Sequence, residues 1–407
     1  MSCIIIGASH AGVQAAVNLR RQGYQGKVIL ISSDTVLPYQ RPPLSKAFLQ
    51  NVLPEQKLWL RPETFYQQKD VDLMLGKRVI NIDREQRTVS LDDMQCLSYD
   101  KLILATGASI RRLTVPGSDL SEVHYLRDYQ DTIGIRDSLK SANNVVVIGG
   151  GYIGLEAAAS LQKLGKNVTL LIKHDRPLSH ITSNVVSDYL TQRHATHGVN
   201  IQLNVVVTEI IGVDKVLAVE TENGQRYQAD MVIVGIGVVP EQQLAEQCGL
   251  DVNNGIRVNE YMQTSDHNIF AIGDCSSFYH PVYQKQLRIE SVQNATDQAK
   301  TATTAICGQS VPYSATAWFW SDQYDDKLQI AGLSEGYDEI VIRQETEKSL
   351  AVFYLAQNQL IAVDTINQPK SFMISRKYIH NLPKVDKTIL ADKNQDLNSA
   401  FTEIPGV

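Results

Sequence analysis

Short apolar runs, separated by a glycine turn and a stretch of helical periodicity, characterise the beginning of the chain. An apolar run at Cys3–Ile6 precedes a glycine turn, a helical stretch ending near Gly23, and a second apolar run at Val28–Ile31. Apolar runs of about four to eight residues that flank one helix are typical of two parallel, buried strands. The pattern predicts a βαβ unit over the first 35 residues.

The turn inside this unit has the spacing of a dinucleotide-binding motif. Gly7 allows the tight turn after the strand, and Gly12 allows the helix to pack closely on the strand. Ser9 replaces the middle glycine, so a small side chain must fit beside the phosphates. Asp34 lies 22 residues after Gly12, where a carboxylate can accept hydrogen bonds from a ribose. We therefore expect a pyrophosphate at the N-terminus of the helix.

The same pattern recurs further along the chain, with its glycine motif complete. A strand at Val145–Ile148 leads into the turn Gly149–Gly154, an alanine-rich helix extends to Gly165, and a strand follows at Val168–Ile172. One such motif is weak evidence, because glycine turns also begin ordinary α/β units that bind nothing. Two motifs about 140 residues apart indicate an α/β protein with two Rossmann-like dinucleotide-binding domains.

Two further apolar strands end in small or polar residues. One ends at Thr106 and Gly107, which would let the backbone pass close to a cofactor. The other ends at Gly273 and Asp274. An aspartate there can hydrogen-bond a ribitol hydroxyl, although a turn or helix cap is the simpler explanation for Asp274 taken alone.

Composition and charge narrow the classes of protein. The 407 residues favour two or three domains, and no apolar run approaches the ~18 residues that cross a bilayer. The first residues pass directly into a strand without a basic leader, so we expect a cytoplasmic protein. Five scattered cysteines predict reduced thiols and no metal site. The formal net charge of −6 argues against nucleic acid as the main partner.

Several longer segments resemble the ferredoxin and rubredoxin reductases, within the larger glutathione-reductase-like flavoprotein group. These segments are 38–46 (PYQRPPLSK), 105–107 (ATG), 125–127 (YLR), 149–156 (GGGYIGLE), 271–275 (AIGDC), 288–295 (RIESVQNA) and 318–324 (WFWSDQY). From residue 2 to about residue 375 they follow the order of that family.

The resemblance implies an FAD-dependent NAD(P)H oxidoreductase with three domains. The FAD-binding domain would consist of residues 1–110 and 240–315, and the NAD(P)H-binding domain of residues 111–239. Residues 316–407 would form an α+β C-terminal interface domain.

The resemblance also assigns residues to the two nucleotides. Val79 would offer backbone contacts to the adenine, and Arg127 would reach the charged portion of FAD. Asp274 would bind the ribitol, and Val292 the pyrimidine edge of the flavin. With the motif residues, the expected cofactor-binding set is Gly7, Ser9, Ala11, Gly12, Asp34, Arg41, Lys46, Val79, Thr106, Gly107, Arg127, Gly149, Gly151, Ile153, Gly154, Lys173, His174, Gly235, Gly273, Asp274, Glu290, Val292 and Trp320.

Three residues receive a catalytic role by the same resemblance. Lys46 and Glu156 would form an ion pair near flavin N5, and Trp320 would flank the flavin or the nicotinamide. Without the family context, the two charges are equally typical of solvated helix surfaces. A Trp-Phe-Trp run is then typical of a half-buried strand, in which Trp318 and Phe319 belong to the core.

The loop after the second motif bears on the choice of coenzyme. Ile172 stands where relatives of this family carry an acid, and a carboxylate at that position favours NADH. Lys173 and His174, with Arg176 or His180, could instead neutralise the 2′-phosphate of NADPH. We expect NADPH to be used at least as well as NADH. The alternative is a solvated basic loop without a ligand.

The absence of cysteines from one stretch of the chain indicates the class of electron acceptor. A disulfide reductase needs a reactive cysteine pair soon after the first βαβ unit, and residues 35–95 contain no cysteine. We therefore expect electrons to pass directly from the flavin to a ferredoxin or rubredoxin that serves an oxygenase or a cytochrome P450. Two alternatives stay open: a redox-sensing flavoprotein of the apoptosis-inducing-factor type, and a small-molecule reductase acting on a quinone or a radical. The oligomeric state and the docking surface are left open.

Overall fold

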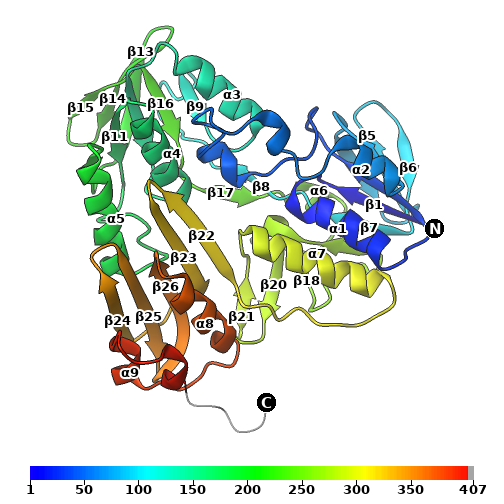
Figure 1. Cartoon of the computed structure of the whole chain (residues 1–407). Coiled ribbons are helices and arrows are strands. Elements are labelled where there is room, and N and C mark those ends of the chain that lie inside the picture. Colours follow the sequence, from blue (N-terminus) through cyan, green and yellow to red (C-terminus); the bar gives the residue numbers. More distant parts are fainter. Residues whose placement is uncertain (402–407) are drawn as a thin grey trace. The chain divides into compact units, whose positions relative to one another are not determined.

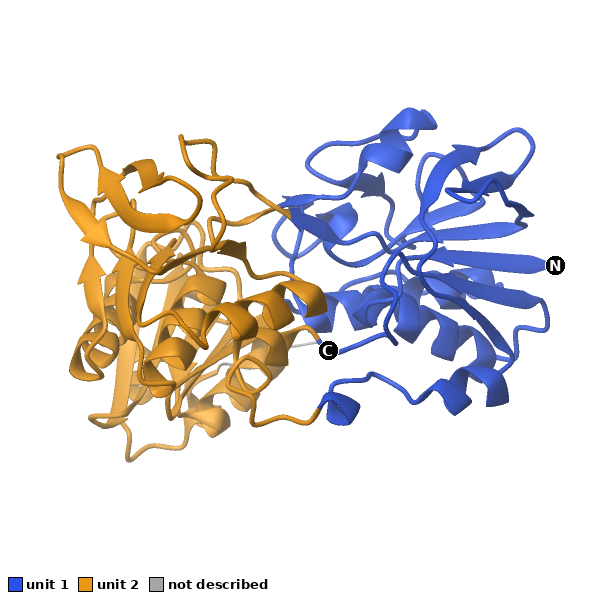
Figure 2. Cartoon of the chain, turned by 90° about the horizontal axis from the view of Figure 1, so that it is seen from above, with its two compact units in different colours: residues 1–40, 55–109, 239–317 blue, residues 41–54, 110–238, 318–407 orange. Residues whose placement is uncertain are grey.

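The computed structural model describes residues 1–401 and divides into two compact units, drawn in blue and orange in Figure 2. Unit 1 consists of residues 1–40, 55–109 and 239–317. Unit 2 consists of residues 41–54, 110–238 and the chain from residue 318 onward. Residues 402–407, which we assign to the C-terminal domain, lie outside the described residues.

Unit 1 is built on a five-stranded parallel sheet (Figure 1). In pairing order, the strands are β19 (Ile269–Ala271), β7 (Lys101–Leu104), β1 (Ser2–Ile6), β2 (Lys27–Ile31) and β3 (Val71–Met74). The central strands are almost wholly buried, as expected when both faces of a parallel sheet are covered. Helix α1 (His10–Arg21) packs on β1 and β2 and against α7 (Val292–Ile306).

Two smaller sheets and several short helices complete unit 1. One sheet is antiparallel and consists of β4 (Val79–Asp83), β5 (Thr88–Leu91) and β6 (Cys96–Ser98). The other consists of β18 (Ile256–Val258), β20 (Ser276–His280) and β21 (Lys285–Leu287). The short helices are η2 (Glu55–Lys57), α2 (Glu63–Gln68), α6 (Gln243–Gln247) and η3 (Gly273–Cys275). Strands β8 (Ala108–Ile110) and β17 (Val238–Pro240) lie where the chain passes between the units.

Unit 2 contains a second five-stranded parallel sheet with the same kind of turn. Its strands, in pairing order, are β12 (Asn200–Gln202), β11 (Asn167–Leu171), β10 (Asn144–Ile148), β16 (Met231–Val234) and β9 (Val123–Tyr125). The helices that accompany it are η1 (Pro42–Ser45), α3 (Tyr129–Ser138), α4 (Tyr152–Lys163) and α5 (Asn184–Thr196). An antiparallel sheet of β13 (Val207–Gly212), β14 (Val216–Thr221) and β15 (Arg226–Gln228) shares its hydrophobic core.

The C-terminal part of unit 2 is an antiparallel sheet with its own core. The strands pair in the order β22 (Trp318–Gln323), β23 (Asp326–Gly332), β26 (Gln359–Ile366), β25 (Ser349–Ala356) and β24 (Glu339–Thr346). The helices that follow are α8 (Pro369–Ile379), α9 (Lys387–Ala391) and η4 (Leu397–Ala400). Buried residues of these strands and helices form one hydrophobic cluster.

The expected elements are observed, with small differences in length. Both βαβ units are confirmed, with every strand and helix boundary within two residues of the prediction. The Trp-Phe-Trp run lies in strand β22, as expected for a half-buried strand. The division into three domains stays a prediction, and residues 41–54, which we place in the FAD domain, fall within unit 2. No helix within residues 1–401 combines the length and the apolar character needed to cross a bilayer.

Candidate functional site

The first glycine turn is shaped by contacts within unit 1. Gly7 has a φ of +104°, and a Cβ there would lie 2.2 Å from the carbonyl oxygen of Ala105. A Cβ on Gly12 would lie 1.8 Å from the carbonyl oxygen of Gly7. Because any side chain would collide with the backbone, both positions require glycine where the turn, helix α1 and the end of β7 meet. Helix α1 begins directly after this turn, with Ser9 as its N-cap residue.

The second glycine turn has the same geometry and, in addition, an open side. A Cβ on Gly149 would lie 2.2 Å from the carbonyl oxygen of Gly235, and one on Gly154 would lie 2.0 Å from that of Gly149. A Cβ on Gly151, the N-cap residue of α4, would meet no described atom within 4 Å. Neighbouring Ile153 is 42% exposed. Space beside the free N–H groups of a helix N-terminus fits a bound pyrophosphate.

Two strand ends in unit 1 lie against the first glycine turn. The Thr106 hydroxyl donates a hydrogen bond of 2.6 Å to the Glu241 carbonyl, and Gly107 has a φ of +75°. Gly273 has a φ of +76°, and a Cβ there would lie 3.1 Å from the Cβ of Ala11. The two strand ends that we expect near a cofactor therefore border the turn after β1.

The remaining FAD-site predictions in unit 1 occupy three different surroundings. Asp34 is partly exposed in the loop after β2, and its carbonyl accepts from the Gly76 N–H at 2.9 Å. Val79 is buried at the start of β4, and Val292 is the first residue of α7. Glu290 is exposed and forms an ion pair of 2.5 Å with Arg288. Their contacts to FAD stay predictions.

Unit 2 brings Arg41 and Arg127 together, although 86 residues separate them in the chain. The Arg41 guanidinium donates to the Arg127 carbonyl at 2.7 Å. The Arg127 N–H donates to Asp131, whose carboxylate also completes a capping box at the start of α3. Arg41 was expected to bind a cofactor and Arg127 to reach the charged portion of FAD, and both roles stay predictions.

A buried ion pair joins Lys46 to Glu156 in unit 2. The Lys46 Nζ lies 2.8 Å from Glu156 Oε2, and the exposed fractions of the side chains are 17% and 2%. Ser45 donates to the same oxygen at 2.5 Å, and Ser321 donates to Oε1 at 2.6 Å. The ion pair implied by the resemblance is present, and the alternative of two solvated surface charges is wrong for Glu156. A buried carboxylate needs this many donors to offset its lost hydration.

A second set of hydrogen bonds fixes the segment that carries Lys46. The Ser160 hydroxyl, on the same helix as Glu156, donates to the Ser45 carbonyl at 2.7 Å. The Gln50 amide donates to the Ser160 hydroxyl at 2.8 Å. Residues on both sides of Lys46 are therefore held against α4.

Aromatic side chains of β22 lie beside the start of α4. The Phe319 ring packs on Tyr152, with ring centroids 4.3 Å apart. Trp320 is partly buried, with its centroid 5.6 Å from that of Trp318 and 6.2 Å from that of Phe319. Trp318 packs against the C-terminal core, as expected. The role of Trp320 beside the flavin or the nicotinamide stays a prediction.

Sequence reasoning missed the two serines that donate to Glu156 and the Gln323 amide that donates to one of them, Ser321. Ser45, Ser321 and Gln323 all lie inside segments that carry the family resemblance. Ser321 and Gln323 occupy alternate positions of the expected strand and so share a face. That alternation was the available signal, but it does not show which helix the face contacts.

The loop after β11 offers basic side chains to solvent. Lys173 and His174 are exposed, and the His174 ring lies 4.8 Å from that of His180. Ile172 is 1% exposed and packs on the backbone of Gly150, so it presents no polar group. Arg176, the other possible 2′-phosphate ligand, instead forms hydrogen bonds with residues that follow it in the chain. Its guanidinium donates to the carbonyls of Ser179 and Thr182 and to Ser187.

None of the five cysteines forms a disulfide in the structure. Burial raises the pKa of the Cys3 thiol to about 12, and it also raises those of Cys248, Cys275 and Cys307. Because the thiolate is the reactive form, these four thiols are poorly suited to disulfide chemistry. Within residues 1–401, His, Cys, Asp and Glu side chains form no metal-ligand cluster.

Comparison with known proteins assigns the family. The family described as pyridine nucleotide-disulphide oxidoreductase matches residues 1–299, and the one described as reductase C-terminal matches residues 318–401. The chain belongs to the pyridine nucleotide-disulphide oxidoreductase family. As a member of this family it is an oxidoreductase that uses FAD and a pyridine nucleotide.

Several relatives that are named reductases are similar to this chain over almost their whole length. Rhodocoxin reductase from Rhodococcus erythropolis is 42% identical over 98% of this chain and 94% of the relative. Rubredoxin-NAD(+) reductase from Pseudomonas putida is 41% identical over 91% of this chain and 97% of the relative. The crystal structure of a covalent putidaredoxin reductase–putidaredoxin complex gives a TM-score of 0.93 at 40% identity, covering 97% of this chain and 96% of the other. The predicted resemblance to ferredoxin and rubredoxin reductases is confirmed.

Proposed function

We propose that this protein passes electrons from a reduced nicotinamide nucleotide, through FAD, to a small iron–sulphur or rubredoxin-type carrier protein. The observation that carries the proposal is the buried Lys46–Glu156 ion pair. Lys46 lies in residues 35–95, the stretch in which a disulfide reductase would have its cysteine pair. The names of the relatives, which refer to rhodocoxin, rubredoxin and putidaredoxin, support the same acceptor class.

Each part of the site would have a distinct task. Bound FAD would accept a hydride and release its electrons singly, which is the chemistry that joins a nicotinamide to a one-electron carrier. The N-termini of α1 and α4 would hold the two pyrophosphates. Lys46 and Glu156 would fix the charge and the geometry where the hydride is transferred, and Trp320 would provide an aromatic plane for stacking.

The coenzyme that we propose is NADPH, used at least as well as NADH. Lys173, His174 and His180 are all exposed in the loop after β11, and the two imidazole rings lie 4.8 Å apart. A 2′-phosphate would receive charge-assisted hydrogen bonds from them. The rubredoxin reductase from Pseudomonas putida is named for NAD(+). The two coenzymes must therefore be compared directly, by their kcat/KM values. A kcat/KM for NADH about a hundredfold above that for NADPH would contradict the proposal.

Carrier-dependent reduction of cytochrome c tests the acceptor class. The purified yellow protein is mixed with NADPH and cytochrome c, with and without a [2Fe–2S] ferredoxin or a rubredoxin. We expect a rate that rises with carrier concentration and saturates. Saturating activity with a quinone and none with any carrier would point to a small-molecule reductase. Sluggish reduction of the flavin by both nucleotides would point to a redox sensor.

We place the enzyme in the cytoplasm, in accord with its five unpaired thiols.

A further inference from the structure

A continuous line of hydrogen bonds extends from the Glu156 carboxylate along β22 to helix α5. Ser321 donates to Glu156 Oε1 at 2.6 Å, and the Gln323 amide donates to the Ser321 hydroxyl at 3.1 Å. Nε2 of His194 lies 2.9 Å from Gln323 Oε1. The Tyr324 hydroxyl lies 3.0 Å from Nδ1 of His194. The line connects the proposed reaction centre with the tip of the β22–β23 hairpin.

Four of the five residues in this line are almost completely removed from solvent, and Tyr324, at its far end, is partly exposed. Ser321 and His194 are 0% exposed, and Gln323 and Glu156 are each 2% exposed. Buried polar groups keep their hydrogen-bond partners, because leaving one unsatisfied costs its full desolvation. Burial also lowers the pKa of His194 to about 4, so its imidazole is neutral at neutral pH.

Chemistry fixes the direction of every hydrogen bond in the line. A carboxylate can only accept, so the Ser321 hydroxyl must donate to Glu156, and its oxygen is left to accept from the Gln323 NH2 group. The Gln323 carbonyl then faces His194, which must carry its single hydrogen on Nε2. Nδ1 of His194 accepts from Tyr324. All four hydrogens therefore point toward Glu156.

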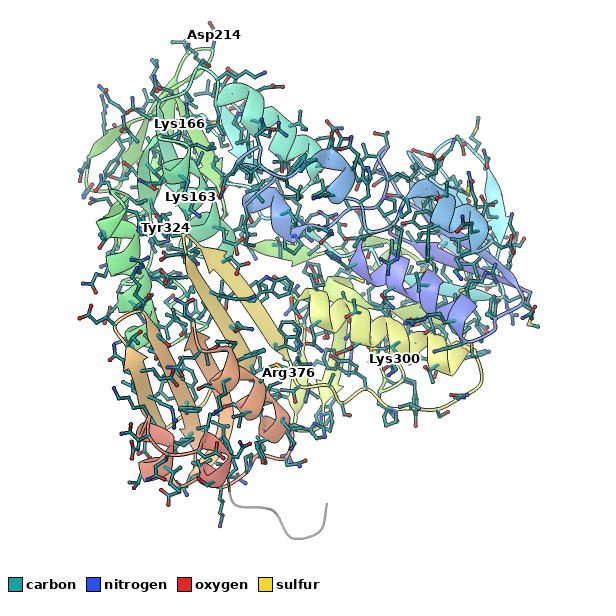
Figure 3. The ribbon with its side chains drawn as sticks, in the orientation of Figure 1. Lys163, Lys166, Asp214, Lys300, Tyr324 and Arg376 are labelled. Carbon is teal, nitrogen blue, oxygen red and sulfur yellow. The ribbon has the colours of Figure 1, made fainter. Side chains whose placement is uncertain are left out.

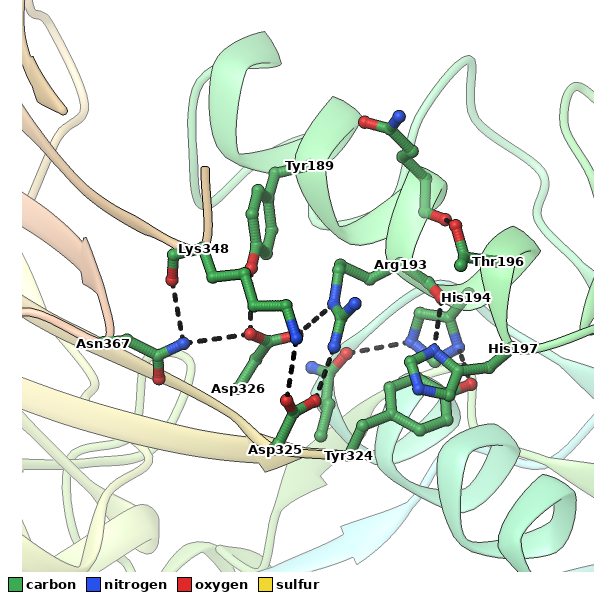
Figure 4. A network of polar contacts seen from close by, with 12 residues as sticks. Tyr189, Arg193, His194, Thr196, His197, Tyr324, Asp325, Asp326, Lys348 and Asn367 are labelled. Atoms are coloured by element: carbon green, nitrogen blue, oxygen red, sulfur yellow. Dashed lines mark hydrogen bonds and ion pairs between the residues drawn. The ribbon is translucent and has the colours of Figure 1, made fainter. Parts of the chain in front are cut away.

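The far end of the line is anchored on two helices. The Tyr324 carbonyl accepts from Lys163 at 2.9 Å, and Figure 3 labels both residues. The Tyr324 ring stacks on His197, with centroids 3.7 Å apart. Arg193 of α5 forms ion pairs of 2.5 Å with both Asp325 and Asp326 (Figure 4). The hairpin tip is therefore held by α5 and by the C-terminal end of α4, so β22 presents Ser321 to Glu156 in a fixed position.

We propose that Ser321, Gln323 and His194 are positioning residues of the hydride transfer, which hold the Glu156 carboxylate in one orientation against Lys46. This inference rests on the proposed function of the ion pair. Lys46 and Ser45 both bind Oε2, so Ser321 is the one described donor to Oε1. Without it, the carboxylate can rotate about its terminal bond and the geometry for hydride transfer loosens.

The test uses holoenzyme variants with a conservative rescue and a matched control. Ser321→Ala removes the donor, Gln323→Leu breaks the line one residue further away, and Ser321→Thr restores the hydroxyl. Lys327→Ala, on the exposed face of the same hairpin, is the control. Anaerobic stopped-flow mixing with NADPH gives the limiting rate of flavin reduction and the nucleotide dissociation constant. We expect the rate to fall at least tenfold in the first two variants, with a dissociation constant within about threefold of wild type. Ser321→Thr and the control keep the rate.

A second readout does not depend on turnover. Urea unfolding of the holoenzyme, at one fixed FAD concentration, is measured for Ser321→Ala, Glu156→Gln and the double variant. We expect clear non-additivity, since the two side chains are in contact. Additive effects, or a Ser321→Ala rate equal to wild type while Glu156→Gln is slow, would overturn the inference and leave the proposed function standing. A Glu156→Gln rate equal to wild type would overturn the proposed role of Glu156, and this inference with it.

Discussion

Two glycines of the second nucleotide turn are needed for different physical reasons. Gly154 is needed by the protein itself, because a Cβ there would lie 2.0 Å from the carbonyl oxygen of Gly149. Gly151 has ordinary backbone angles, with a φ of −80°, and an added Cβ would meet no described atom within 4 Å. A bound pyrophosphate is what would make a side chain at Gly151 costly.

Alanine at these two positions should separate folding from nucleotide binding. We expect Gly154→Ala to lower the free energy of unfolding by about 1–3 kcal/mol, because the added methyl group displaces backbone. Gly151→Ala should change it by less than about 0.5 kcal/mol and yet raise the KM for the nicotinamide nucleotide roughly tenfold. Urea unfolding and steady-state kinetics measure the two effects. Equal behaviour of the two variants would contradict this assignment.

Coenzyme choice is predicted to depend on Lys173. A carboxylate beside the 2′-phosphate would repel it, whereas the ribose of NADH carries no charge there. We expect Lys173→Glu to lower kcat/KM for NADPH about tenfold or more and that for NADH by less than about threefold. The matched control is Lys215→Glu, in the β13–β14 turn of unit 2. If Lys173→Glu lowered kcat/KM equally for both coenzymes, the basic loop would not bind the 2′-phosphate.

At the scale of elements, local pattern predicted the βαβ units but not what holds Glu156. Strands such as Cys3–Ile6 follow from apolar runs and glycine turns, which act over a few residues. The bonds to Glu156 from Ser45 and Ser321 join residues 111 and 165 positions apart. Hydrophobic periodicity carries no information about such pairs, so only the family resemblance indicated Lys46, and nothing in the sequence ranked Ser321.

Helix α5 carries an acid-sensitive group in His194. An exposed histidine has a pKa near 6.5, and burial lowers that of His194 to about 4. Between these values the unfolded chain binds a proton that the folded chain does not, so stability is complete above pH 6.5 and is lost as the pH falls toward 4. The loss amounts to about 3 kcal/mol at pH 4.

Comparison with His194→Gln isolates this contribution. The titratable and charged groups that interact with the ring, His197 and Arg193 of the same helix and Asp326 of the hairpin, are unchanged in the variant. The difference in unfolding free energy between wild type and variant should shrink as the pH falls from 6.5 to 4. A difference that stays constant over this range would show that His194 titrates normally.

Strand β26 holds a group with the opposite pH dependence. Burial raises the pKa of Asp364 to about 7, although hydrogen bonds from Tyr354 and Thr182 oppose the shift. Here the folded chain keeps a proton that the unfolded chain releases, so stability falls as the pH rises from 3.8 to 7. We expect Asp364→Asn to gain roughly 4 kcal/mol relative to wild type between pH 4 and pH 8. Parallel stability curves for the two proteins would contradict this.

For the whole molecule, the sequence predicted two nucleotide folds and a reductase family, and both are confirmed. The acceptor was predicted from the missing cysteine pair, and the raised pKa values of four of the five thiols agree with that reasoning. The coenzyme could not be fixed in the same way. Exposed side chains such as Lys173 and His174 have the same appearance whether or not they bind a phosphate.

The central claim is that the chain binds FAD and reduces it with a nicotinamide nucleotide. Anaerobic mixing of the purified protein with NADPH or NADH, followed by visible absorbance, tests it directly. We predict a yellow protein with one FAD per chain that bleaches rapidly and stoichiometrically with reduced nucleotide. A colourless protein that cannot be reconstituted with FAD, or a yellow one that neither nucleotide bleaches, would contradict the account.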